Sequence, residues 1–304
     1  MCFFGLSVCP NLINSLRLQD KTLSDFLLSF VNFALKYKEL KMDDKQYRTG
    51  IVLSGGGARG FAHLGVLQAL NEAGVFPDIV SGTSAGALTG ALYCDGYTPG
   101  EILRIMKLHS RLDYMRPTLP RDGLLQITGI VKILETNLRA KRFEDLKIPF
   151  IAAATDLNRG KPAYFSEGEL ITPLIASSSI PVLFKPVIID KTYYVDGGVL
   201  DNLPVKPIEN SCRLLIGSFV NPVGYEATTS GLITIAMRTF MLNQAREAVE
   251  KRKKFDLLIA PSQLTRFGIL EVEKADEIYA LGYEKTKEKL KDPEVQKMIA
   301  EQMQ

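Results

Sequence analysis

Two consecutive strand–turn–helix patterns occupy residues 51–97, and no other feature of the sequence constrains the fold as strongly. The first consists of the apolar run IVLS, a glycine-rich turn and a stretch of helical periodicity that ends at Gly74. The second consists of the apolar run DIV, a turn of small residues and the helical run AGALTGALY. Strands that alternate with helices are typical of α/β domains. We therefore expect a three-layer α/β/α sandwich with a mostly parallel central sheet.

The rest of the sequence extends this pattern. Buried strands are expected in the runs IPFIAAATDL, RLLIGSFV and FDLLIAPS, and hairpin-like returns in KPAYFSEG and DKTYYVDGGVLDNLPV. Residues 98–146 are mainly helical in pattern, and the chain becomes helical and charged beyond Phe267. We divide the chain into an N-terminal extension (1–47), a central domain (48–262) and a helical C-terminal tail (263–304).

Composition limits the partners that this chain can have. The 304 residues are 46% hydrophobic and 23% charged, and the net charge of +3 is too small to indicate nucleic acid binding. It is compatible with a loose attraction to anionic lipid, so we expect a cytoplasmic protein with peripheral membrane contact as an option. Four cysteines and two histidines fit neither a zinc site nor a redox pair, so no metal and no cofactor is expected. The oligomeric state is left open.

Residues 1–47 have two interpretations. Apolar residues recur at helical spacing between Leu23 and Tyr37, which predicts an amphipathic helix that packs on the main domain, in preference to a surface helix that meets a membrane or a partner. Alternatively, Met42 is the natural start, because the sequence that follows it reads like an ordinary cytosolic beginning. No stretch of the chain is long enough and uncharged enough to cross a bilayer.

The first turn, Gly55–Gly60, has the sequence GGGARG and lies between an expected strand and an expected helix. Glycines let successive N–H groups point into one space, and a helix N-terminus adds partial positive charge. Such a loop can hold a phosphate or the oxyanion of a tetrahedral intermediate. The pattern G-x-G-x-x-G is also a dinucleotide fingerprint, for which Asp78 lies near the expected distance. We expect the Arg59 side chain to orient the loop rather than to meet a phosphate headgroup.

The second turn has the sequence GTSAG, with Ser84 at its centre. G-x-S-x-G between a strand and a helix is the pattern of a nucleophile elbow, in which the serine has a strained backbone. Small neighbours prevent clashes there, which is a role for Gly82 and Gly86; Thr83 and Ala85 complete the turn. The competing interpretation is a tight turn with an ordinary helix N-cap.

A serine nucleophile needs a base, and histidine is scarce in this chain. His109 lies on an amphipathic helical stretch, and His63 lies in the helix that follows the glycine loop. We expect both to be packed or exposed rather than catalytic, so a Ser-His-Asp triad is not indicated.

A carboxylate is the alternative base. Asp196 ends an aromatic and apolar strand and is followed by Gly197 and Gly198, which allow another backbone to approach closely. Burial there would raise the proton affinity of the carboxylate. Asp-Gly is also a common hairpin turn, and Asp156 and Asp201 are lesser candidates.

The motifs GGGARG, GTSAG and DGG, in this order, resemble those of the patatin-like phospholipase family, in particular its small stand-alone bacterial members. The resemblance covers residues from about 51 to about 261 and includes the segments FAHLGVL, RFEDLKIPF and SSSIPVLFKPV. It implies a patatin-like catalytic domain that hydrolyses acyl esters of lipids with a serine–aspartate dyad. It further implies that Ser84 is the nucleophile and Asp196 the base. The oxyanion hole would come from the loop of Gly55, Gly56, Gly57, Ala58, Arg59 and Gly60.

Two other functions remain open at this point. The first is a nucleotide-binding module or oxidoreductase that uses GGGARG for a pyrophosphate. The second is a membrane-recruited regulator with a dormant site. The lipid, its acyl length, and the choice between hydrolysis and acyl transfer are not indicated by the sequence.

Overall fold

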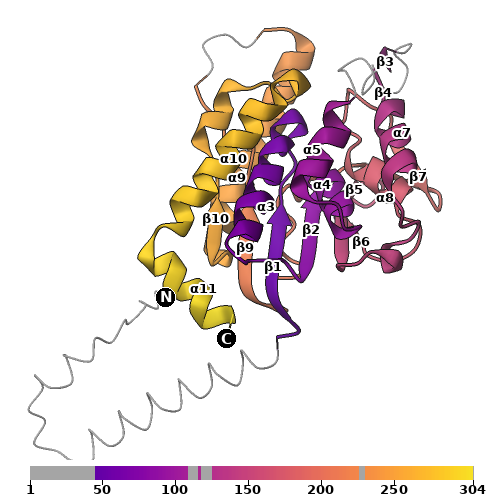
Figure 1. Ribbon diagram of the computed structural model, residues 1–304. Coiled ribbons are helices and arrows are strands. Elements are labelled where there is room, and N and C mark those ends of the chain that lie inside the picture. The colour runs from indigo at the N-terminus through magenta and orange to yellow at the C-terminus, as the bar shows by residue number, and fades with distance from the viewer. Residues whose placement is uncertain (1–44, 109–115, 118–124, 226–229, 304) are drawn as a thin grey trace, which may run out of the picture. The chain divides into compact units, whose positions relative to one another are not determined.

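The computed structural model describes residues 45–108, 116–117, 125–225 and 230–303 (Figure 1). The interpretations of residues 1–44 and of His109 fall outside these described residues.

The described residues contain an eight-stranded mixed sheet. Its strands follow the order β10-β9-β1-β2-β5-β8-β7, and β6 pairs with β5 beside this path. The strands β10, β9, β1, β2 and β5 run parallel to one another, whereas β6 and β8 pair antiparallel with β5, and β7 pairs antiparallel with β8. Their bounds are β1 Tyr47–Leu53, β2 Ile79–Thr83, β5 Phe150–Asp156, β6 Lys161–Phe165, β7 Val187–Ile189, β8 Thr192–Asp196, β9 Cys212–Ser218 and β10 Leu257–Ile259. A separate pair, β3 (Arg116–Pro117) with β4 (Leu125–Gln126), lies off this sheet.

Helices cover the sheet, which confirms the expected α/β/α sandwich. The helices are α3 Phe61–Glu72, α4 Ala85–Cys94, α5 Pro99–Lys107, α7 Thr128–Asn137, α8 Ile171–Ser177, α9 Leu232–Lys251, α10 Ala275–Leu290 and α11 Pro293–Met303. In Figure 1, α3 and α10 lie side by side on the near face of the sheet. The expected antiparallel return after β5 is present as β6, and the strand before Asp196 forms a hairpin with β7.

The alternation of side chains along β1 separates two cores. Ile51 and Leu53 point toward the larger core, which α3, α4 and α10 help to form. Val52 points to the opposite face, where Leu203 and Ile208 cover it. Successive residues of a strand point to opposite faces, so a run that is apolar at every position indicates a sheet covered on both sides.

The helices α3 and α10 pack with their backbones in close approach. A Cβ atom on Gly65 would collide with the backbone of Tyr279 and Tyr283, and one on Gly282 would collide with the carbonyl of Ala62. Only glycine permits this distance at either position. The start of α3, which carries the glycine loop, is therefore held against the C-terminal part of the chain.

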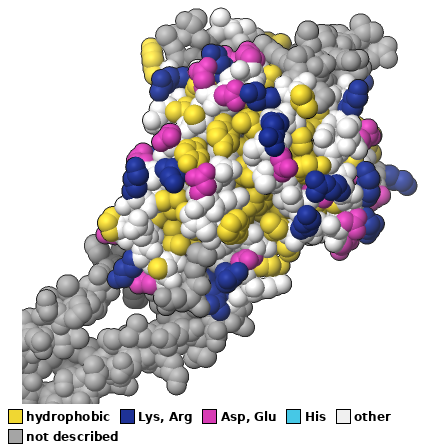
Figure 2. All heavy atoms as spheres, viewed as in Figure 1, with side chains coloured by type: hydrophobic (Ala, Val, Ile, Leu, Met, Phe, Trp, Pro, Cys, Tyr) yellow, Lys and Arg dark blue, Asp and Glu magenta, His cyan; other side chains and the backbone are white. Residues whose placement is uncertain are grey.

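The surface seen in Figure 2 mixes the two signs of charge. Lys and Arg side chains are interspersed with Asp and Glu side chains, and hydrophobic side chains are exposed between them. Within the described ranges, none of the helices has the length and apolar character needed to cross a bilayer.

Candidate active site

Ser84 lies at the sharp turn between β2 and α4. Its backbone has φ 53° and ψ −121°, a conformation that L-residues rarely adopt and that is costly to maintain. The close contacts of the turn explain its glycines: a Cβ atom on Gly82 would lie 2.5 Å from the carbonyl oxygen of Gly86, and one on Gly86 would collide with that of Leu53. The Ser84 N–H donates a hydrogen bond to Ser177 Oγ at 2.9 Å, which anchors the turn to α8. A strained turn of this kind between a strand and a helix is typical of a nucleophile elbow.

Strand register brings Asp196 to the same place. Thr83, at the end of β2, pairs with Ala153 of β5, and the next residue of β5, Ala154, pairs with Asp196 of β8. Asp196 therefore lies two strands from the residue that precedes Ser84. The turn that follows it packs equally closely, because a Cβ atom on Gly197 would lie 2.9 Å from Thr83 Cγ2.

Asp196 is 1% exposed, and only one oxygen of its carboxyl group has a hydrogen-bond partner among the described residues. Oδ1 accepts a hydrogen bond from the Gly198 N–H at 2.7 Å, whereas Oδ2 has no hydrogen-bond partner among the described residues. Burial raises the pKa of Asp196 to about 7, and the nearby Ser84 hydroxyl and the Gly198 N–H oppose this rise. The Ser84 hydroxyl is thus close enough to affect the carboxylate, although no hydrogen bond of ordinary length joins the two side chains.

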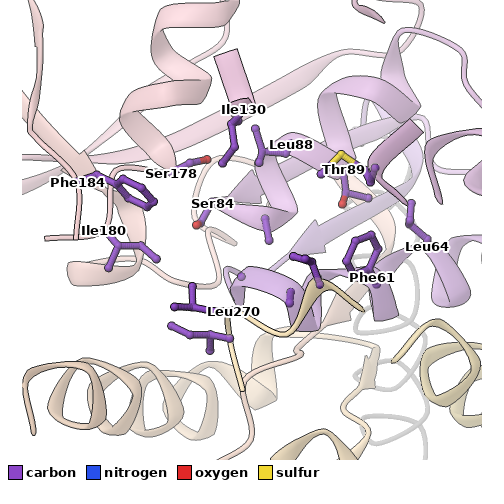
Figure 3. A pocket seen from close by; sticks show the side chains of 17 residues that line it. Phe61, Leu64, Ser84, Leu88, Thr89, Ile130, Ser178, Ile180, Phe184 and Leu270 are labelled. Atoms are coloured by element: carbon purple, nitrogen blue, oxygen red, sulfur yellow. The ribbon is translucent and has the colours of Figure 1, made fainter. Parts of the chain in front are cut away.

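The glycine loop lies beside Ser84: a Cβ atom on Gly55 would be 3.3 Å from Ser84 Cβ, and one on Gly60 would be 2.6 Å from Ala85 Cβ. Its left-handed residue is Gly57, with φ +56°. Figure 3 shows Ser84 with its hydroxyl turned into the adjoining pocket.

The N–H groups of the glycine loop differ in their availability. Three of them donate to carbonyl groups of the protein: Gly55 to Asn202, Ala58 to Ile269 and Arg59 to Gly56. In the described part of the chain, the N–H groups of Gly56 and Gly57 have no acceptor. A small pocket of about 260 Å³ is lined by Gly56, Gly57, Ser84 and Asp196 together. Two unengaged donors, a hydroxyl and a carboxylate therefore border one volume.

Arg59 is 5% exposed, and its guanidinium group holds the glycine loop in place through hydrogen bonds. It donates hydrogen bonds to the carbonyl of Phe267 at 2.8 Å, to Asn221 Oδ1 at 3.2 Å and to the carbonyl of Pro222 at 3.1 Å. These contacts join the loop to the segment after β9 and to the segment before α10. The arrangement matches the expectation that Arg59 orients the loop.

His63 is fully buried under the loop. Its Nε2 lies 2.8 Å from the carbonyl of Ser54, so that nitrogen must carry the proton. Its Nδ1 then accepts from Ser218 Oγ at 2.7 Å. Burial lowers the pKa of His63 to about 4, so the imidazole is neutral at pH 7. His63 therefore joins the end of β1 to the end of β9, and both of its ring nitrogens are engaged by groups other than Ser84.

The other acidic candidates are engaged elsewhere. Asp156 pairs with Arg159 at 2.9 Å, and Asp201 pairs with Lys251 at 2.5 Å. Asp78 accepts a hydrogen bond from the Thr49 N–H and lies just before β2, at the amino end of the strand. A dinucleotide site needs its acidic residue at the carboxyl end of the sheet, so the position of Asp78 does not fit that alternative. No group of three or more His, Cys, Asp or Glu side chains within the described residues is arranged to hold a metal ion.

An apolar pocket opens next to Ser84 (Figure 3). It encloses about 750 Å³, partly open to solvent. Figure 3 shows Ile180, Phe184, Ser178 and Ser84 at one end of the pocket, and Phe61, Leu64 and Thr89 at the other. The remaining lining comes from the glycine loop, α4, α5, α7 and the segment before α10, including Leu88, Met106, Ile130, Ile269 and Leu270.

Two residues of the site were not singled out from the sequence. Ser177 Oγ accepts from the Ser84 N–H and donates to the carbonyl of Ala153 at 2.6 Å, so it ties the elbow to β5. Asn202 is fully buried, and neither atom of its side-chain amide has a hydrogen-bond partner among the described residues. The sequence did contain a signal for Ser177. Three consecutive serines, Ser177–Ser179, lie in an apolar segment, and buried hydroxyl groups need hydrogen-bond partners.

Comparison with known proteins gives a consistent result. The family model described as Patatin-like phospholipase matches residues 51–208. An uncharacterized NTE family protein of Mycobacterium tuberculosis is 36% identical over 163 residues, which cover 53% of this chain and 45% of that protein. Lysophospholipase nte1 of Emericella nidulans is 32% identical over 277 residues, which cover 79% of this chain and 18% of that protein. The chain thus spans less than half the length of these curated relatives. The crystal structure of VipD from Legionella pneumophila has a TM-score of 0.47 and 16% identity, over 80% of this chain and 66% of that one.

Proposed function

Because this chain belongs to the patatin-like phospholipase family, we propose that it hydrolyses acyl esters of lipids, with Ser84 as nucleophile and Asp196 as general base. Substrates of this class include phospholipids, lysophospholipids and simple acyl esters. The observation that carries the proposal is the meeting of Ser84, Asp196 and the Gly56 and Gly57 N–H groups around one pocket. Lysophospholipase nte1, a relative, carries the same class of activity in its name.

Acylation begins when Ser84 Oγ attacks the carbonyl carbon of the ester. Asp196 Oδ2, which has no hydrogen-bond partner among the described residues, accepts the hydroxyl proton. An aspartate with its ordinary pKa of about 3.9 is a weak base, whereas a pKa near the working pH suits general base catalysis. The raised pKa of Asp196 therefore supports its role.

The negative charge that develops on the carbonyl oxygen needs donors that are already in place. The unengaged N–H groups of Gly56 and Gly57 supply them, whereas those of Gly55, Ala58 and Arg59 are occupied. Removing one donor of this kind typically costs about 3–4 kcal/mol of transition-state stabilisation. The proposal thus narrows the oxyanion hole of the Gly55–Gly60 loop to two groups.

Collapse of the tetrahedral intermediate breaks the bond to the leaving alcohol, which receives the proton from Asp196. Water then enters, Asp196 accepts one of its protons, and the resulting hydroxide attacks the acyl-serine carbonyl. The proton returns to Ser84 Oγ as the fatty acid leaves. Throughout, the apolar pocket beside Ser84 holds the acyl chain.

Hydrolysis of a panel of phospholipids, lysophospholipids and p-nitrophenyl acyl esters tests this proposal. The full chain is compared with Ser84→Ala, Asp196→Asn and the control Ser81→Ala, whose hydroxyl binds the carbonyl of Pro204 away from the pocket. We expect activity in the wild type and the control and a loss of at least 10³-fold in the other two. A fluorophosphonate should label Ser84. Equal activity of Ser84→Ala and the wild type would refute the proposal, and absence of labelling would favour a dormant site.

A further inference from the structure

The apolar pocket contains a hydroxyl group that the catalytic proposal does not use. Ser178, at the end of α8, is 4% exposed and lines the pocket next to Ser84. Its Oγ has no hydrogen-bond partner among the described residues. A buried hydroxyl without a partner costs about 1–3 kcal/mol. Such a group in a mostly apolar binding site points to a polar atom on the ligand.

The neighbouring serines show that this is not a general property of the segment. Ser177 Oγ is engaged with the Ser84 N–H and the Ala153 carbonyl, and Ser179 Oγ donates to the carbonyl of Ile175 at 2.8 Å. Of the three serines, Ser178 lines the pocket, and its hydroxyl lacks a partner among the described residues. The backbone of Ser178 is satisfied separately, because its N–H donates to Ile175 and its carbonyl accepts from Ile180.

The position of Ser178 indicates which part of the ester lies next to it. Asp196 belongs to the lining of the small pocket and Ser178 to that of the large apolar one, while Ser84 borders both. The alcohol leaves on the side of Asp196, so the acyl chain occupies the apolar side. In Figure 3, Ser178 lies at the same end of this pocket as Ser84, near Phe184 and Ile180. An acyl chain that enters the pocket from Ser84 would therefore meet Ser178 near its ester end.

We propose that Ser178 binds an oxygen substituent near the carboxyl end of the acyl chain, so that the protein prefers esters of hydroxylated acyl chains, such as 3-hydroxyacyl esters, over esters of plain alkyl chains. This inference rests on the proposed ester hydrolysis at Ser84. A serine hydroxyl can both donate to and accept from a substrate hydroxyl. A site that is built to bind a substrate hydroxyl discriminates against the analogue that lacks it, because its own polar group is then left unpaired.

The test compares p-nitrophenyl 3-hydroxydodecanoate with p-nitrophenyl dodecanoate. We expect kcat/KM of the wild type to favour the hydroxylated ester by roughly tenfold. Ser178→Ala should reverse this preference, because the hydroxylated chain loses its partner and the plain chain no longer meets an unpaired hydroxyl. The matched control Ser179→Ala removes a neighbouring buried hydroxyl outside the pocket and should keep the wild-type preference.

Binding of the two free acids to the full chain, measured by calorimetry, separates the two proposals. Hydrolysis of both esters at equal rates by the wild type, or equal losses on both esters in Ser178→Ala, would overturn the inference and leave the proposed function standing. Tighter binding of 3-hydroxydodecanoate without hydrolysis of either ester would support the inference and count against the proposed function. The wild-type preference alone decides the matter if Ser178→Ala does not fold.

Discussion

Ala154 and Asp196 are paired across the antiparallel strands β5 and β8, and this pairing sets the carboxylate beside the serine elbow. Neighbouring parallel strands carry the elbow and the glycine loop, so the base reaches them from a strand that runs the opposite way. The site is therefore assembled by strand register rather than by proximity in the sequence.

Ser84→Gly should be more stable than Ser84→Ala. Both variants lose the nucleophile, but only glycine adopts φ 53° and ψ −121° without strain. We expect a difference of about 1–2 kcal/mol in the free energy of unfolding, measured by urea denaturation. Equal stability of the two variants would show that the elbow stores no strain.

Asp196→Asn should stabilise the protein at neutral and alkaline pH. Because the folded-state pKa of about 7 lies above the unfolded value, the unfolded chain releases a proton that the folded chain retains, and stability falls as pH rises toward 7. Removing this titration should add about 2–4 kcal/mol above pH 7, and the gain should vanish near pH 4. Thermal unfolding of both proteins between pH 4 and pH 9 measures it. A gain that is independent of pH would contradict the pKa of Asp196.

The same carboxylate should set the pH dependence of activity. A general base must be deprotonated in the free enzyme, so kcat/KM should rise with pH and level off above a midpoint of about 7. The measurement is a pH series with a soluble acyl ester and the wild-type chain. A midpoint near 4 would indicate that the base has an ordinary environment.

Gly57→Ala should abolish most of the activity. Its positive φ disfavours alanine, and the added Cβ would collide with the carbonyl of Ile269, so the Gly57 N–H would move. We expect kcat to fall by at least 10²-fold. The control is Gly74→Ala, which also has a positive φ (+75°) but has open space around its Cβ. Comparable losses of kcat in the two variants would argue against a role for the Gly57 N–H.

In His63→Gln, the free energy of unfolding should fall less steeply with decreasing pH than in the wild type. The folded-state pKa of about 4 lies below the ordinary value of 6.5, so the unfolded chain binds a proton that the folded chain cannot, and stability falls as pH drops through this range. This effect amounts to about 3 kcal/mol. The titration of Asp196 raises stability as pH falls over the same range. The contribution of His63 is therefore obtained from the difference in unfolding free energy between the variant and the wild type. Parallel unfolding profiles for the two proteins would contradict a neutral His63.

The local parts of the fold and of the site were accessible from the sequence. Apolar runs followed by glycine-rich turns predicted β1 and β2, and the spacing around Ser84 predicted its turn, because these features depend on near neighbours. The pairing of β8 with β5 was not predicted, since strand register depends on contacts between distant segments. The same reason explains why Ser177 was missed, and why the sequence could not tell the engaged N–H groups of Gly55 and Ala58 from those of Gly56 and Gly57.

The glycine loop is held in part by the end of the chain. Ala58 N–H binds the carbonyl of Ile269, and the Arg59 guanidinium binds the carbonyl of Phe267. Both acceptors lie beyond residues 51–208, where the family model matches. A shortened protein that stopped at residue 262 would keep every side chain proposed for the chemistry. It would nevertheless lose two of the hydrogen bonds that hold the glycine loop in shape. A fusion protein that is built from this domain would therefore have to include the segment that contains Phe267 and Ile269.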